Sequence, residues 1–449
     1  MPTPGAQPGP GDPRGNSNAL RALGLKLELK KNSSSEQSPA DSTGIAPEQP
    51  TASTHRSVIA EGRTSVKERA SEAATSQTSL LYGVPVAKVG AHPNRTERLG
   101  KMVRPYNRFL EEISMQLNFR ALFVAILLLA GGAGAQERVR FSLDWRIEGP
   151  VAIFFHAEQK GYFKQEGLDV SLDVGTGSAA AVTRVATGAY DMSFGDLSAL
   201  IEYYANVSNP SRMQAVYMVH EQAPGAIFTL KKSGIRKASD LVGKKLGGPS
   251  FDAVRKMLPL VAKANGFDAK AVQLVSMEPA LRETMLVKGD VDAITGFYYT
   301  QLLTLNARGV KTEDMQWFTY ADMGLSNLYG NAIIASEKMI AERPKAIAGF
   351  LRALNRAIKE VLADPDGTIG SVKRREPLVD EKIELQRLKL FLEFVSTPNA
   401  KLDGIGSIRK TKLENQVDDV VNAFGLKNKP SADLLFNSGF LPSRGERRI

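Results

Sequence analysis

The sequence predicts an α/β fold built from two similar lobes. Short strands alternate with helices along the chain, Gly-rich turns separate several strands from the next helix, and this series occurs twice. Strands that alternate with helices form a parallel sheet with helices on both faces. The chain leaves the first series and returns after the second, so we expect two doubly wound lobes joined by two hinge crossovers, with the second lobe inserted into the first.

Residues 1–114 are predicted to lie outside this fold. They carry three aromatic residues, Tyr82, Tyr106 and Phe109, and long stretches of them consist of Ser, Thr, Pro and Gln. Such a composition buries too little apolar surface to offset the entropy of ordering. We interpret them as a disordered extension, or as residues upstream of a true translation start at Met115.

Residues 115–135 have the pattern of a secretory signal peptide. Met115–Arg120 is a short positive region, Ala121–Ala130 is apolar, and Ala133-Gly134-Ala135 matches an A-x-A cleavage site. A membrane span is the alternative, but it needs about 20 apolar residues. We therefore expect export to the periplasm with cleavage near Ala135.

The first series starts with a strand at Val139–Leu143, which alternates and ends at Asp144-Trp145. A helix is expected from Gly149 to Lys160, because Pro is favoured at the first helical positions and Gly161 ends it. The next strand, helix, strand and helix are predicted at 168–174, 179–186, 191–194 and 197–205.

The second series repeats this order. Its strands are predicted at 245–247, 272–276 and 291–295, and its helices at 252–265 and 279–288. The chain is expected to cross between lobes near 216–228 and again near 329–334, and to end in helices at 344–363, 380–394 and 413–424. The first lobe would then comprise 136–225 plus 330–449, and the second 226–329.

Composition excludes several classes of site. The chain has no Cys, which removes disulfides, zinc–thiolate sites, iron–sulfur clusters and thiol nucleophiles. The net charge of +10 is not gathered into a basic run with interleaved aromatics, so nucleic acid is not an expected partner. His156 and His220 are isolated, and we expect neither a metal site nor a bound cofactor.

Several motifs resemble the solute-binding proteins of ABC importers for sulfonates, nitrate, taurine and thiamine-pyrimidine precursors. They are Leu143-Asp144-Trp145, the stretch Ala157–Val170, Gly188–Met192, Leu241–Lys245 and Val287–Ala293. The resemblance implies a type II periplasmic binding fold that closes on its ligand by hinge motion. It also implies a small-molecule ligand and an ABC permease in the inner membrane as partner, and we expect a monomer.

The Asp-Trp pair also resembles the pyrimidine branch of this family, which includes enzymes that synthesise the thiamine pyrimidine. In those enzymes a Lys that holds pyridoxal phosphate and a His follow the third strand, and a Cys-rich motif precedes the return strand. This sequence has Gly195 and Ala199 at the Lys and His positions and no Cys. The enzyme therefore remains the less favoured alternative to a binding protein, and a periplasmic sensor domain is a third.

Trp145 and Asp144 end the first strand, where ligands of open α/β sheets bind. Trp145 is expected either to stack on a planar ligand or to pack in the core. Asp144 would accept hydrogen bonds from a ligand amino group or cap the following helix.

The remaining candidates lie at other strand ends and loop starts. Ser178 and Ser250 would open two helices whose N-termini face each other and suit an anion or a polar headgroup, or they simply cap those helices. Aromatic residues at such positions suggest a pocket for a heterocycle. The other expected ligand-binding residues are Phe194, Gly195, Asp196, Phe251, Glu278, Gly296, Phe297, Tyr329 and Asn331.

Overall fold

The computed structural model describes residues 136–449. The predicted extension at 1–114 and the predicted signal peptide at 115–135 lie outside the described residues. Within 136–449, no helix combines the length and the apolar character that crossing a membrane requires.

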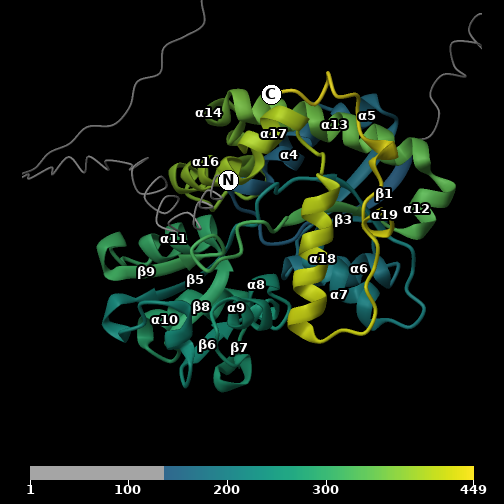
Figure 1. Ribbon diagram of the computed structural model, residues 1–449. Coiled ribbons are helices and arrows are strands. Elements are labelled where there is room, and N and C mark those ends of the chain that lie inside the picture. The colour runs from purple at the N-terminus through teal and green to yellow at the C-terminus, as the bar shows by residue number, and fades with distance from the viewer. Residues whose placement is uncertain (1–135) are drawn as a thin grey trace, which may run out of the picture. The chain divides into compact units, whose positions relative to one another are not determined.

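Two five-stranded sheets organise the chain, and Figure 1 shows them as separate groups of strands. The first sheet has the order β2-β1-β3-β10-β4 and the second β7-β6-β8-β5-β9. The first is made of β1 (Glu137–Ser142), β2 (Leu168–Asp173), β3 (Met192–Asp196), β4 (Gln214–Met218) and β10 (Asn331–Ala335). The second is made of β5 (Gly225–Leu230), β6 (Lys245–Gly248), β7 (Gln273–Ser276), β8 (Ala293–Phe297) and β9 (Met315–Thr319). Below, each sheet with the helices that pack on it is called the first or the second lobe.

Both sheets are mixed, which corrects the expectation of parallel sheets. Strands β1, β2 and β3 run parallel, but β10 runs antiparallel to β3 and to β4. In the second sheet, β5 is likewise antiparallel to β8 and β9. The reversed strands are those next to a crossover, because a strand that enters from the other lobe arrives in the opposite direction. The α/β class is confirmed.

Helices follow most strands. In the first lobe they are α4 (Ala152–Gln159), α5 (Tyr162–Gln165), α6 (Ser178–Ala186) and α7 (Leu197–Asn206). In the second they are α8 (Ala253–Lys256), α9 (Leu258–Ala264), α10 (Arg282–Lys288) and α11 (Tyr298–Ala307). The chain after β10 is helical, with α12 (Glu337–Glu342), α13 (Pro344–Ala363), α14 (Pro365–Thr368), α15 (Gly370–Arg375), α16 (Glu381–Val395), α17 (Pro398–Asp403), α18 (Lys410–Phe424) and α19 (Ala432–Leu435).

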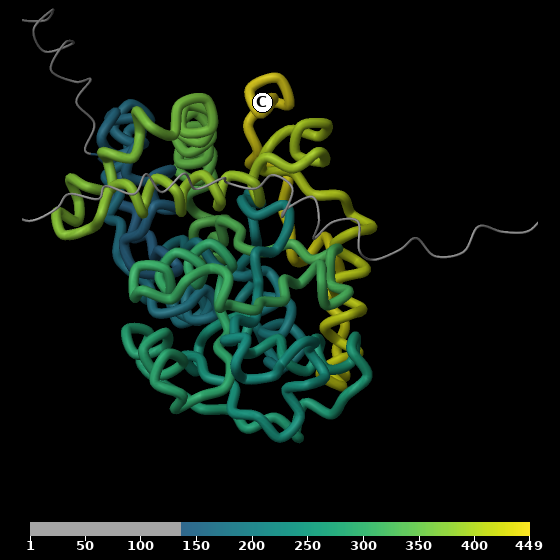
Figure 2. The backbone as a smooth tube through the Cα atoms, turned by 90° about the vertical axis from the view of Figure 1, so that its left-hand side faces the viewer, coloured from purple at the N-terminus to yellow at the C-terminus, as the bar shows by residue number. Residues whose placement is uncertain are grey.

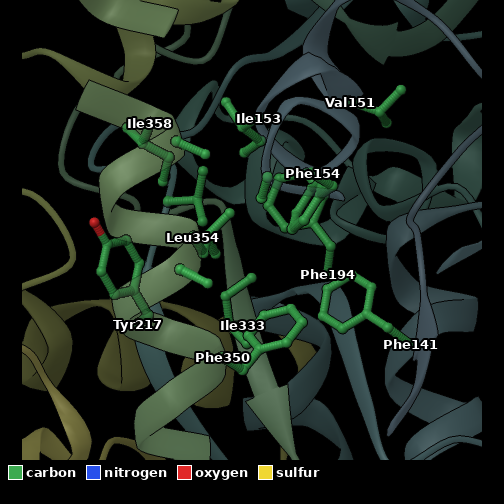
Figure 3. Packing of buried hydrophobic residues seen from close by; sticks show 14 of the residues in the cluster. Phe141, Val151, Ile153, Phe154, Phe194, Tyr217, Ile333, Phe350, Leu354 and Ile358 are labelled. Atoms are coloured by element: carbon green, nitrogen blue, oxygen red, sulfur yellow. The ribbon is translucent and has the colours of Figure 1, made fainter. Parts of the chain in front are cut away.

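The core of the first lobe packs α4 and α13 against the sheet. The Phe154 ring lies 5.1 Å from that of Phe141 and 5.4 Å from that of Phe194, and Phe350 stacks on Phe141 at 5.0 Å (Figure 3). A buried aromatic side chain contributes both its area and its ring contacts to stability. This packing fixes β1, whose carboxyl end leads to the candidate site.

Two segments connect the sheets. The first crossover, residues 219–224, runs from β4 to β5, and the second, residues 320–330, runs from β9 to β10. The crossing was expected near 216–228, and within that range residues 216–218 belong to β4 and residues 225–228 to β5, which leaves 219–224 as the connection. Figure 2 shows the teal and green tube that carries the second lobe in the lower part of the folded chain. The exact limits of the two lobes stay a prediction.

Candidate functional site

A cavity lies between the two lobes, at the carboxyl ends of β1 and β8. It encloses about 460 Å³ of space, part of which is open to solvent. Its lining residues are Asp144, Trp145, Arg146, Glu148, Pro150, Val151, Gly177, Ser178, Asp252, Arg282, Phe297, Tyr299 and Thr300. This position, outside the carboxyl ends of strands, is the usual ligand site of open α/β sheets.

Asp144 is a buried carboxylate on the wall of this cavity. Its exposed fraction is 6%, and one of its oxygens, Oδ2, accepts a hydrogen bond of 2.9 Å from Nδ2 of Asn331. Burial raises the pKa of Asp144 to about 7, and nearby Glu148 adds to this, while hydrogen bonds from the backbone and Asn331 oppose it. Among the described residues Asp144 forms no ion pair, so a positive or hydrogen-donating ligand group would compensate its charge.

Trp145 lines the cavity rather than the core. It is half-buried and belongs to none of the hydrophobic clusters of the described chain. Arg282 of the second lobe lies over its ring at 5.0 Å from the centroid, and Arg146 at 5.5 Å. The indole therefore already accommodates a planar, delocalised cation from the opposite lobe.

The two arginines of the cavity are neutralised by carboxylates. Arg282 is 1% exposed, donates to Glu283 from Nε and Nη2 at 3.1 and 2.9 Å, and lies 3.6 Å from Asp252. Arg146 donates to Glu148 at 3.1 Å. Three carboxylates and two guanidinium groups line the cavity, which gives it a negative balance.

Polar contacts join the lobes beside the cavity. Thr300 of α11 donates to Oε2 of Glu148 at 3.0 Å. Arg387 of α16 donates to the backbone oxygen of Thr300 at 2.9 Å and to Oγ1 of Thr304 at 3.2 Å. Arg387 also binds both oxygens of Glu384, at 3.0 and 3.3 Å. The lobes thus touch through buried hydrogen bonds, as expected of a closed cleft.

The structure brings together five of the expected site residues. Asp144, Trp145, Ser178 and Phe297 line the cavity, and Asn331 contacts Asp144 from behind. Phe251 lies close by, because a Cβ atom at Gly177 would lie 2.3 Å from its backbone oxygen, but its own side chain is 54% exposed.

The other expected residues lie away from the cavity wall. Phe194 and Tyr329 are each 1% exposed and belong to hydrophobic clusters, and Gly195 and Gly296 lie within β3 and β8. Asp196 caps α7 by accepting from the backbone nitrogen of Ala199 at 2.9 Å, and Glu278 is exposed. Residues at strand ends can point to either face of the sheet, and the sequence pattern alone does not show which of them point into the cavity.

Ser250 does not open a helix, which corrects that expectation. It is exposed and donates to Ser276, whereas α8 begins at Ala253 and is capped by Asp252, which accepts from the nitrogen of Arg255 at 2.8 Å. The N-terminus of α8 is therefore occupied by a carboxylate of the protein. Ser178, by contrast, is the first residue of α6, whose start has no side-chain cap.

Several residues of the cavity were missed by sequence reasoning: Glu148, Asp252, Arg282, Tyr299 and Thr300. Tyr299 and Thr300 lie in the first turn of α11, which begins at Tyr298 directly after Phe297 and which the sequence pattern did not reveal. Within residues 136–449, no group of three or more His, Cys, Asp or Glu has the arrangement of a metal site.

The comparisons with known proteins agree with this geometry. A family model described as "NMT1/THI5 like" matches residues 150–368. This segment is NMT1/THI5-like. The resemblance found in the sequence motifs is thereby confirmed for residues 150–368.

Relatives of this NMT1/THI5-like chain include both binding proteins and enzymes. The formylaminopyrimidine-binding protein of Halalkalibacterium halodurans is 25% identical over 63% of this chain and 88% of its own length. The 4-amino-5-hydroxymethyl-2-methylpyrimidine phosphate synthase of Aspergillus parasiticus is 24% identical over 54% of this chain and 72% of its own length.

Solved structures show the same fold. The alkanesulfonate-binding protein SsuA of Xanthomonas axonopodis pv. citri, bound to MOPS, aligns with a TM-score of 0.52 at 13% identity, over 68% of this chain and 99% of its own. The nitrate-binding protein NrtA of Synechocystis PCC 6803 also has a TM-score of 0.52, at 12% identity, over 68% of this chain and 86% of its own.

Proposed function

We propose that this protein is the substrate-binding protein of an ABC importer and that it binds a thiamine-pyrimidine precursor. It captures the ligand between its lobes in the periplasm, after export through the signal peptide at 115–135, and delivers it as a monomer to a permease in the inner membrane. The limits predicted for the lobes, 136–225 plus 330–449 and 226–329, are part of this proposal.

The observation that carries the ligand class is the buried carboxylate of Asp144 beside the indole of Trp145. An aminopyrimidine has a planar ring for the indole and amino hydrogens for the carboxylate. Sulfonates and nitrate are anions, and in this cavity they would meet three carboxylates and two arginines that are already paired. The name of the formylaminopyrimidine-binding relative supports the same class.

Synthesis of the pyrimidine is the alternative function, favoured only by the names of some relatives. The position expected of the lysine that would hold pyridoxal phosphate is Gly195, in β3. A Cβ atom there would lie 3.0 Å from the side chains of Ile334 and Val182, so a lysine at this position would require those side chains to shift, and the glycine present offers no amine to the cofactor. The residues present do not fit that cofactor.

Binding calorimetry with formylaminopyrimidine, taurine, an alkanesulfonate and nitrate tests the proposal. We expect heat from formylaminopyrimidine alone, and we expect Trp145→Ala to abolish it. Trp317→Ala is the matched control, because Trp317 is the chain's other tryptophan and packs on Phe228 in β5, away from the cavity. Saturable binding of a sulfonate or of nitrate, unaffected by Trp145→Ala, would refute the ligand class.

Binding of pyridoxal phosphate separates the two functions. We expect no absorbance change of pyridoxal phosphate on mixing and no rise in melting temperature, whereas formylaminopyrimidine raises the melting temperature by mass action. A stoichiometric pyridoxal phosphate complex would favour the enzyme.

A further inference from the structure

The two crossovers meet at His220 and Asn331. His220 lies in the first crossover, and Asn331 begins β10 directly after the second. The backbone nitrogen of His220 donates to the oxygen of Asn331 at 2.9 Å, and Gly330 donates back to the oxygen of His220 at 3.1 Å. The imidazole adds a third bond, since its Nδ1 accepts from the backbone nitrogen of Asn331 at 3.2 Å.

His220 is held uncharged at this junction. It is fully buried, with the rings of Phe194, Phe297 and Phe391 between 5.2 and 5.6 Å away. Burial lowers the pKa of His220 to about 3, so the ring is neutral at physiological pH. Because Nδ1 accepts, the proton belongs on Nε2, which faces the hydroxyl of Tyr299 on the cavity wall at 3.4 Å.

Asn331 contacts Asp144, the carboxylate proposed to bind the ligand, but does not itself line the cavity. Its side chain is 0% exposed and is absent from the lining, and its Nδ2 donates to Oδ2 of Asp144 at 2.9 Å. Its Oδ1 is buried and has no partner in the described part of the chain. A group so placed acts on a ligand only through Asp144.

We propose that Asn331 and His220 are positioning residues for ligand binding: His220 fixes the backbone of Asn331, and Asn331 holds Oδ2 of Asp144 so that Oδ1 faces the ligand. The inference rests on the proposed function of the cleft. It implies that the protonation state of Asp144 depends on a contact made where the two crossovers meet.

The charged groups that face Asp144 are known from the lining. Glu148 and Asp252 are acidic, Arg146 and Arg282 are basic and already paired, and Tyr299 is a phenol whose pKa burial raises well above its usual value. A hydrogen bond donated to a carboxylate favours its charged form. Loss of the Asn331 bond therefore makes Asp144 harder to ionise.

The test measures the pKa of Asp144 in the ligand-free full chain, by NMR of carboxyl-labelled aspartate. We expect Asn331→Leu, which keeps the shape and removes the donor, to raise this pKa by about one unit. Asn355→Leu is the matched control: Asn355 is also buried, but it bonds Tyr217 and the backbone oxygen of Glu446, and its loss should leave the pKa of Asp144 unchanged.

The role of His220 is tested by a pair of variants. His220→Asn keeps an acceptor near the position of Nδ1 and should retain the wild-type pKa of Asp144, whereas His220→Leu removes it and should raise that pKa in part. The wild-type protein supplies a readout that needs no variant, because the side-chain amide signal of Asn331 should titrate with the midpoint of Asp144. The proposal would be overturned if Asn331→Leu left the pKa of Asp144 unchanged, or if the side-chain amide signal of Asn331 did not shift with pH.

The ligand is a separate arm of the same experiment. If formylaminopyrimidine binds, its pH profile in Asn331→Leu should move upward with the pKa of Asp144, which weakens binding about tenfold below the midpoint. If the wild-type protein ignores formylaminopyrimidine while the pKa of Asp144 moves as expected, the proposed ligand is wrong and the positioning role stands.

Discussion

Substituting Asp144 by Asn should stabilise the ligand-free protein above neutral pH and abolish ligand binding. The pKa of Asp144 is about 7 in the folded protein, against 3.8 in the unfolded chain. Between these values the unfolded chain loses the proton and the folded protein keeps it, so stability falls as pH rises. At about 1.4 kcal/mol per pKa unit, the ionised group costs at most about 4 kcal/mol at pH 8.

The pH dependence gives this prediction its sign. Below pH 4 the carboxyl group is neutral in both states, and wild type and Asp144→Asn should unfold at similar denaturant concentrations. The stability of the variant relative to wild type should rise steadily between pH 4 and pH 7 and stay higher above pH 7. Urea unfolding followed by circular dichroism at pH 4, 5.5, 7 and 8 measures it, and calorimetry with formylaminopyrimidine checks the loss of binding.

Asp290→Asn is the control for this series, because Asp290 is exposed in the turn after α10. Its effect on stability should stay within about 0.5 kcal/mol at every pH. A stability difference between wild type and Asp144→Asn that is the same at pH 4 and pH 8 would show that Asp144 carries no buried charge. If Asp144→Asn were less stable than wild type at pH 8, that result would also contradict a destabilising buried charge at Asp144.

Two further substitutions test contacts near the crossovers. Lys412→Met should cost about 3 kcal/mol in thermal or urea unfolding, because it leaves Glu221, buried in the first crossover, without its ion-pair partner at 2.8 Å. Lys429→Met, which breaks an exposed pair, should cost less than about 1 kcal/mol, and equal losses would contradict this. Gly177→Ala should keep the cleft from closing, since its Cβ atom would lie 2.3 Å from the backbone oxygen of Phe251 in the other lobe; a scattering profile identical to wild type would argue against it.

Most of the fold could be predicted from local patterns. The strands at 168–174 and 272–276 and the helices at 344–363 and 380–394 were placed within two residues, because Gly, Pro and apolar periodicity mark their ends. Strands β4, β5 and β9 next to the crossovers were missed, whereas residues 329–334 were expected to form the strand that is β10, but without its pairing partners. Strand β10 pairs with β3 across more than a hundred residues, and no local pattern records such pairing.

The site was predictable where strand ends point into the cleft, as at Asp144 and Trp145. Arg282 and Glu283 were missed for a physical reason. Two adjacent charged residues in a helix usually face solvent, but these two bury each other, and the position of Asp252 beside Arg282 depends on tertiary structure.

The charge preferred by the cleft depends on which groups cap its helices. An open helix N-terminus attracts anions through its free backbone N–H groups. Here Asp252 on the cavity wall already accepts an N–H group at the start of α8, whereas the start of α6, where Ser178 lines the cavity, has no side-chain cap. The proposed preference for a ligand that donates hydrogen bonds therefore rests on the carboxylates of Asp144, Glu148 and Asp252, and an anion bound at the start of α6 would argue against it.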